Sequence, residues 1–102
     1  MGKIKLYKWD TAEFLRNEED IRLYLETVFE DGTAEEISEA LGNVARARKM
    51  MGKIAKKANV HSKSLYRSLS KKGTPYFRTI NYAVNSLGYQ LTVTPLKQQT
   101  KH

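Results

Sequence analysis

Four side chains between residues 63 and 70 combine hydrogen-bond donors with a spacing suited to nucleic-acid recognition. They are spaced i, i+3, i+4 and i+7, which places Lys63, Tyr66, Arg67 and Ser70 on one helical face. Lys63 and Arg67 can donate hydrogen bonds to O6 and N7 of guanine, and Tyr66 can contact a thymine methyl group or a phosphate. No acidic residue follows Glu39, so this face carries nothing that repels phosphate.

Further polar and basic residues surround this face. Ser62 and Ser64 can bond to base edges or phosphate, whereas His61 either contacts phosphate or only caps or fills a turn. The flanking lysines and arginines suit phosphate contacts, which position a protein without reading sequence. The expected DNA-contacting residues are Lys53, Lys57, His61, Ser62, Lys63, Ser64, Tyr66, Arg67, Lys71 and Arg78.

The pattern from Met51 to Ser70 predicts a helix-turn-helix, with helices over 51–58 and 62–70. Ala55 is the small residue needed where the two helices cross closely, and Asn59 is a turn residue that tolerates left-handed geometry. Apolar residues then lock the helices together: Ile54, Ala58, Val60 and Leu65. A helix entering the major groove reads bases from its first turns, so the second helix is the expected recognition helix.

Charge is divided unequally along the chain. All 11 acidic residues lie within residues 1–42, and 13 of the 18 basic residues lie after them. The basic part fits a polyanion, DNA or RNA first, although a merely solvated basic face is the plain alternative. Such asymmetry indicates two surfaces with two kinds of partner.

Composition excludes several functional classes. With 102 residues the chain is expected to form a single domain, 1–102, and with no cysteine it has neither disulfides nor thiol chemistry. We expect no transmembrane helix and no secretory signal, and therefore a cytoplasmic protein. His61 and His102 make no metal site, and neither a phosphate-binding loop nor a catalytic triad is recognisable, so we expect no cofactor and no enzyme.

Periodicity and capping signals predict a mainly helical bundle of five to six helices. Before the helix-turn-helix we expect a short helix over 10–15, a second that Asn17 caps and Asp31-Gly32 ends, and a third opened by a Thr33–Glu36 capping box. After it, Thr74-Pro75 is expected to open a last helix that Gly88 ends. Tyr89 to Thr94 predicts a short C-terminal strand, either paired with a second copy or lying as a lone edge, before a polar tail over 95–102.

An ordered set of short motifs resembles the addiction module antidote proteins, HigA-like antitoxins with a lambda-repressor-like (Cro/cI) helix-turn-helix. The resemblance covers roughly residues 8–94. Its motifs are Glu18-Glu-Asp-Ile21, Ile37 to Arg48, Leu65-Tyr66-Arg67-Ser68-Leu69, Pro75-Tyr-Phe77 and Ser86 to Leu91. It implies a type II antitoxin, which binds a small RelE/ParE/HigB-like toxin, dimerises on a palindromic operator and represses its own operon.

The resemblance places Ser62, Lys63 and Arg67 where the family reads bases. Two residues depart from its pattern: Asn59 replaces the usual turn glycine, and His61 stands where a capping serine is common. If Ser62 were the cap instead, the residues facing the groove would shift by one.

The acidic residues suggest where a toxin binds. RelE-type toxins are generally basic, so we expect the helices from Asp10 to Glu39, with the Ile4–Trp9 arm, to bind one; the alternative is that the acids only solvate these helices. The expected division is 1–42 for the toxin and 43–94 for DNA. The competing hypotheses are a stand-alone phage or bacterial regulator and a protein–protein adaptor.

Overall fold

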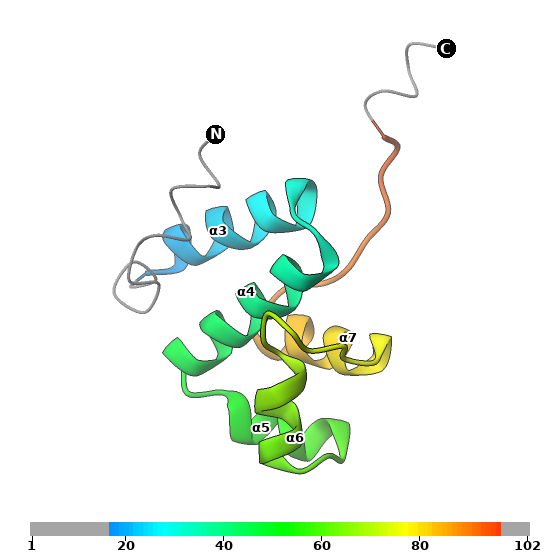
Figure 1. Ribbon diagram of the computed structural model, residues 1–102. Helices are drawn as coiled ribbons and strands as arrows, with labels where there is room; N and C mark the ends of the chain where they lie inside the picture. The colour runs from blue at the N-terminus through cyan, green and yellow to red at the C-terminus, as the bar shows by residue number, and fades with distance from the viewer. Residues whose placement is uncertain (1–16, 97–102) are drawn as a thin grey trace.

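Five helices follow one another along residues 17–96, the part of the chain that the computed structural model describes (Figure 1). They are α3 (Glu18–Asp31), α4 (Ala34–Ala47), α5 (Met51–Ala58), α6 (Ser62–Ser68) and α7 (Phe77–Ser86). Helix α4 is central, because it packs against α3 on one side and against α5 and α7 on the other, while α5 also contacts α6. The expected arm over 4–9, the helix over 10–15 and the tail from residue 97 lie outside the described residues.

The starts of α3 and α4 follow their capping signals. Asn17 accepts a hydrogen bond from the Asp20 backbone N–H at 2.8 Å. Thr33 Oγ1 accepts from the Glu36 N–H at 3.1 Å, and Glu36 Oε1 accepts from the Thr33 N–H at 2.9 Å, which completes the capping box. These bonds satisfy amide groups that a helix start leaves without an intrahelical acceptor. Both predicted starts are therefore confirmed.

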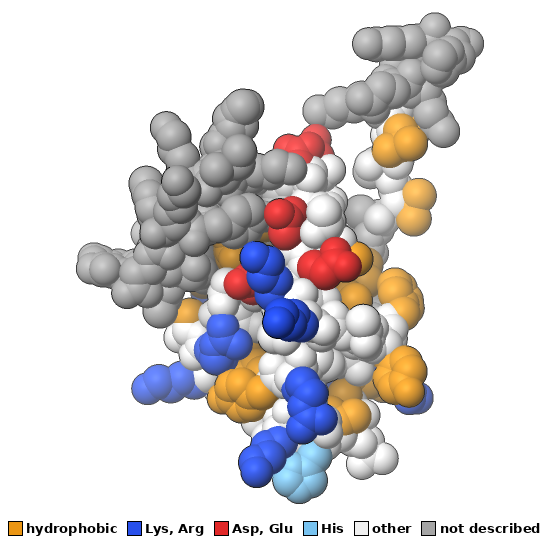
Figure 2. Space-filling model, in the orientation of Figure 1, with side chains coloured by type: hydrophobic (Ala, Val, Ile, Leu, Met, Phe, Trp, Pro, Cys, Tyr) orange, Lys and Arg blue, Asp and Glu red, His pale blue; other side chains and the backbone are white. Residues whose placement is uncertain are grey.

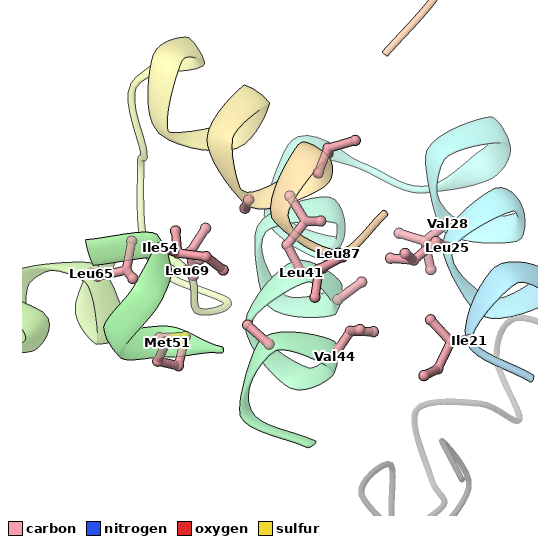
Figure 3. Close-up of a cluster of buried hydrophobic side chains, with 14 of the residues drawn as sticks. Ile21, Leu25, Val28, Leu41, Val44, Met51, Ile54, Leu65, Leu69 and Leu87 are labelled. Atoms are coloured by element: carbon pink, nitrogen blue, oxygen red, sulfur yellow. The ribbon is translucent and has the colours of Figure 1, made fainter. Parts of the chain in front are cut away.

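One hydrophobic core joins the acidic and basic parts of the chain. Leu41 and Val44 of α4, both fully buried, lie between the side chains of α3 and those of α5 and α6, with Leu87 beside them (Figure 3). On the far side of α4, Ile54 and Leu65 are also fully buried. The change in charge after residue 42 falls inside α4, so both charged surfaces are built on this shared core.

The turn between α5 and α6 has the left-handed residue that the sequence predicts. Asn59 has φ 59° and ψ 46°. Its N–H donates to the Lys56 carbonyl, and the Val60 N–H donates to the Ala55 carbonyl at 3.0 Å, so the chain turns sharply out of α5. Gly88, at φ 98°, ends α7 through the same pair of bonds. Lys49 adopts this conformation after α4, at φ 58°, which the sequence did not indicate.

We expect residue 59 to tune the stability of this turn. Asn59→Ala should lower the free energy of unfolding by about 1 kcal/mol, because a β-carbon is disfavoured at positive φ and alanine lacks the local bonding of asparagine. Asn59→Gly should equal or exceed the wild type, since glycine adopts this conformation without steric cost. Urea unfolding of the three proteins measures the order. Equal stability of the alanine and glycine variants would contradict the turn geometry.

The predicted C-terminal strand over Tyr89–Thr94 is wrong for the described residues: residues 87–96 contain no strand. A strand needs a partner for its backbone groups, and no other segment within residues 17–96 supplies one. Tyr89 and Leu91 instead pack against the core, and Asn85 Nδ2 donates to the Tyr89 carbonyl at 2.9 Å. The first two of the alternating apolar residues therefore pack against helices, whereas Val93 is exposed.

Two helix boundaries also differ from the sequence-based expectation. Helix α6 ends at Ser68, two residues early, and the Ser68 and Ser70 hydroxyls donate to the carbonyls of Leu65 and Arg67 in its last turn. Helix α7 begins at Phe77, after an extended Tyr76, and has no Thr74 cap. Proline fits extended chain as well as a first helical turn, so Thr74-Pro75 does not determine the start.

Candidate nucleic-acid interface

Helices α5 and α6 form a compact two-helix unit. A three-residue turn joins them, and they pack on each other through Ile54 and Leu65, which are fully buried, and Ala55, which is 3% exposed. The small side chain of Ala55 allows the close crossing that the sequence predicted. Val60 in the turn packs against the same core. The geometry is compatible with a helix-turn-helix.

The outward face of α6 carries the two side chains best suited to reading bases. Lys63 and Arg67 lie two positions before and after the buried Leu65, so at 100° per residue they point away from the core. Both are exposed, and Tyr66 beside them is 47% exposed. All ten residues expected to contact DNA are exposed in the structure.

The residue that caps α6, either His61 or Ser62, determines which side chains face outward from this helix. His61 is the residue before the first helical turn, with extended backbone angles, and its side chain makes no capping bond. Ser62 is thus the first residue of the helix, and the alternative in which Ser62 is the cap is wrong. The register that puts Lys63 and Arg67 outward stands.

The other expected contact residues lie on neighbouring elements. Lys53 and Lys57 are on α5 and share one side of that helix, four residues apart. Lys71 is in the loop after α6, and Arg78 is in the first turn of α7, so both lie outside the two-helix unit. Figure 2 shows Lys and Arg side chains gathered over the lower half of the molecule, with the acidic side chains above them.

The electrostatics of this half favour an anionic ligand. Within residues 17–96, no lysine or arginine after Arg48 forms an ion pair, so these charges are available to a partner. Helices α5, α6 and α7 also begin without a side-chain cap and without an acid in the first turn. Unsatisfied amide groups at helix starts carry partial positive charge, which adds to that of the side chains.

The opposite half of the molecule is acidic, and several of its charged side chains form ion pairs with one another. Arg22 donates to Glu19 at 2.6 Å and to Glu26 at 3.1 Å, which links three charges along the exposed side of α3. Leu23, 48% exposed, lies between these side chains in sequence. Glu18 pairs with Arg48 and accepts a hydrogen bond from the Tyr89 hydroxyl, so the start of α3 is tied to the end of α4.

A hydrogen-bonded chain joins α3 to α4 beneath this surface. Asn43 Nδ2 donates to the hydroxyl of Tyr24 at 3.1 Å, and Arg46 donates to Asn43 Oδ1 at 2.5 Å. Burial raises the pKa of the Tyr24 hydroxyl, because the phenolate loses its hydration there, although the Asn43 bond lowers it somewhat. No signal in the sequence indicated a partner for the Tyr24 hydroxyl.

The raised pKa of Tyr24 predicts alkaline sensitivity. Below its ordinary pKa of about 10, tyrosine is neutral in both states and stability is unaffected. Above that pH the unfolded chain ionises first, so the free energy of unfolding falls as pH rises until the folded-state pKa is passed. Urea unfolding at pH 9 and 11 should show a smaller loss for Tyr24→Phe than for wild type. Tyr76→Phe, at a 76% exposed position, is the matched control and should keep the wild-type loss.

Gly42 is a structurally important residue that sequence reasoning did not single out. It is buried in the middle of α4, where a Cβ atom would collide with the backbone carbonyl of Leu69. Leu69 directly follows the last residue of α6, so this glycine lets the end of α6 lie close to the central helix α4. A glycine inside a helix lowers stability by about 1 kcal/mol relative to alanine. A glycine in the middle of a predicted helix therefore indicates close packing, and this was the signal that could have identified Gly42.

Comparison with known proteins identifies the family. The model of a family described as probable addiction module antidote protein matches residues 5–95. The chain belongs to this family. It is also 39% identical, over 89 residues, to an uncharacterised protein of Haemophilus influenzae, a match that covers 87% of this chain and 91% of that relative. No solved structure matches the chain.

Membership in the antidote family supports an antitoxin role in a toxin–antitoxin module. It implies a toxin partner, and it indicates a regulatory rather than a catalytic protein. None of the helices between residues 17 and 96 is long and apolar enough to cross a membrane.

Proposed function

We propose that this protein is an antitoxin of a type II module that binds operator DNA as a homodimer, represses its own operon and neutralises a RelE/ParE/HigB-like toxin. The recognition helix is α6, with Lys63 and Arg67 reading bases. Ser62, Ser64 and Tyr66 support that contact, and the remaining expected contact residues bind phosphates: Lys53, Lys57, His61, Lys71 and Arg78.

The observation that supports DNA binding best is the exposed basic face of α6 within a two-helix unit. The face is held rigidly because Leu65 and Leu69 are fully buried beneath it. A rigid helix with outward donors in its first turns is what major-groove readout requires. In a dimer, two such helices would lie about 34 Å apart, in successive major grooves.

Fluorescence anisotropy tests this proposal. The full chain is titrated onto its own upstream DNA and onto a scrambled duplex, at roughly 50 and 200 mM salt. A strong preference for the upstream duplex that persists at the higher salt supports an operator-binding protein. Equal binding that collapses with salt would mean that the basic face attracts polyanions without reading sequence.

The acidic surface of α3 and the first turns of α4 is the proposed toxin-binding region. Its acids complement a basic toxin and would speed encounter, and Leu23 offers an exposed apolar side chain among them. Co-expression with a small basic reading frame adjacent in the genome tests this surface. A stable complex that Leu23→Lys weakens supports it, whereas an unaffected complex would place the toxin elsewhere.

A stand-alone regulator is the second candidate, because the α5–α6 unit alone would serve that function. A stand-alone regulator binds an operator but has no neighbouring toxin gene. The presence or absence of a small basic reading frame beside this gene therefore decides between an antitoxin and a stand-alone regulator. An adaptor for an acidic protein predicts instead that removing Lys63 and Arg67 leaves DNA affinity unchanged.

A further inference from the structure

Two adjacent aromatic side chains at the start of α7 are exposed to solvent. Tyr76 is 76% exposed and Phe77 is 72% exposed, and no other aromatic side chain between residues 17 and 96 is as exposed as either. A ring left in water forgoes the burial that stabilises the aromatic residues of a core. Because the core does not use these two rings, they are suited to contact a partner.

The backbone is fixed on both sides of this aromatic pair. Gly73 lies against the end of α6, where a Cβ atom would collide with the carbonyl oxygens of Arg67 and Ser68. On the other side, Thr79 of α7 is only 5% exposed. Phe77 lies two positions before Thr79, which at about 100° per residue turns its ring away from the core. Both rings are therefore held at a defined place beyond the end of α6.

The charges around the aromatic pair favour a polyanion as the partner. Lys71 and Lys72 precede the pair and Arg78 follows it, and all three are exposed. No acidic residue follows Glu39 in the sequence. A basic toxin would be repelled here, and a second copy of the chain would bring the same positive charges opposite one another. Figure 2 shows hydrophobic side chains beside Lys and Arg side chains at the lower right-hand edge of the molecule.

The chemistry of the rings indicates which part of DNA they contact. If α6 enters a major groove, Lys71 and Arg78 bind the phosphates along its border, and the aromatic pair lies between these two residues in sequence. The phosphate backbone separates that major groove from the neighbouring minor groove. A phenyl ring has no hydrogen-bonding group with which to read base edges. Apolar side chains instead contact DNA from the minor groove, against sugars and between base steps.

We propose that Tyr76 and Phe77 pack against the deoxyriboses of the minor groove beside the major groove that α6 enters. This inference rests on the proposed function and deepens it by adding a contact that responds to the shape of DNA. The width and flexibility of the minor groove vary with sequence, so the rings confer a preference at base pairs that α6 does not touch. Uncharged rings release no counterions, so their contribution to affinity is independent of salt.

Hydroxyl-radical footprinting of the full chain on its own upstream duplex tests this contact, because the radicals cleave DNA at deoxyriboses exposed in the minor groove. The wild type should protect sugars beside the α6 site. Replacing Tyr76 and Phe77 together by alanine should abolish that protection and weaken binding by about tenfold or more. In anisotropy titrations, the slope of log affinity against log salt should stay at the wild-type value, since no charge is removed.

Matched variants separate the rings from other effects of substitution. Tyr76→Phe with Phe77→Tyr exchanges the two side chains and keeps both rings, so affinity and protection should be close to wild type. Leu23→Ala removes an exposed apolar side chain from α3 and should leave DNA binding unchanged. Urea unfolding of the alanine pair should match the wild type, because both rings are exposed.

Two results would overturn the contact. In the first, the alanine pair leaves both the affinity and the sugar protection unchanged. In the second, the alanine pair dissociates a wild-type dimer in sedimentation velocity but binds a half-site duplex as tightly as the wild type does. The rings would then join two copies of the chain instead of touching DNA.

Failure of this inference is separable from failure of the proposed function. A wild type that prefers the upstream duplex, with an alanine pair that binds it equally well, would remove the ring contact alone. A wild type that binds the upstream and scrambled duplexes equally would count against operator recognition. In that case the ring contact would still be decided by whether the alanine pair loses affinity for these duplexes.

Discussion

Replacing Lys63 and Arg67 together by alanine is expected to weaken operator binding by about 100-fold or more. Both side chains point away from the buried Leu65, and each bidentate base contact is worth about 1–3 kcal/mol of discrimination. A loss of 1.4 kcal/mol is a tenfold change in affinity, so two such contacts account for this range. Anisotropy on the operator and on a scrambled duplex measures it, and most of the loss should appear on the operator.

The matched control removes two charges from the neighbouring helix. Lys53→Ala with Lys57→Ala should weaken the operator and the scrambled duplex alike, and should reduce the slope of log affinity against log salt by about two, as expected of phosphate contacts. Both pairs are exposed and four residues apart, so the two double variants remove equal charge at equal spacing. An equal loss on both duplexes for the Lys63/Arg67 variant would remove these residues from base readout.

The sequence predicted those parts of the fold that local chemistry decides. Asn17, Thr33 and Glu36 form caps because their side chains reach the backbone within one turn, whatever the rest of the chain does. Asn59 is left-handed for an equally local reason. The exposed positions of Lys63, Tyr66 and Arg67 followed from helical periodicity, although Ser70, expected on the same face, lies beyond the end of α6. These features need no knowledge of distant contacts.

The features that the sequence missed depend on distant neighbours. Tyr89 to Thr94 alternates like a strand, but a strand forms only where a partner is present, and here Tyr89 and Leu91 pack against helices. Lys49 is left-handed because the Met50 N–H reaches the Ala45 carbonyl, although lysine has no preference for that conformation. The distribution of charge predicted an acidic and a basic surface, but it could not identify which side chains contact a partner.

Gly42→Ala is expected to lower the free energy of unfolding by about 2–3 kcal/mol, since over-packing a well-filled core costs about 1–3 kcal/mol or more. Helix propensity alone predicts the opposite, a gain of about 1 kcal/mol for alanine within a helix. Packing prevails here because the added methyl group would meet the backbone of Leu69, which cannot rotate away as a side chain could. At 4–8 °C per kcal/mol for a domain of this size, the melting temperature should fall by roughly 10–20 °C.

Gly52→Ala is the matched control for this packing effect. Gly52 is also helical, but it is exposed in α5, and a Cβ atom there would meet nothing within 4 Å. The same substitution should therefore raise stability by roughly 0.5–1 kcal/mol. Thermal and urea unfolding of the two variants separate propensity from packing, because the chemical change is identical and only the neighbours differ. If Gly42→Ala were as stable as Gly52→Ala, α4 would not lie against the end of α6 as closely as the structure shows, and α6 would need a different support.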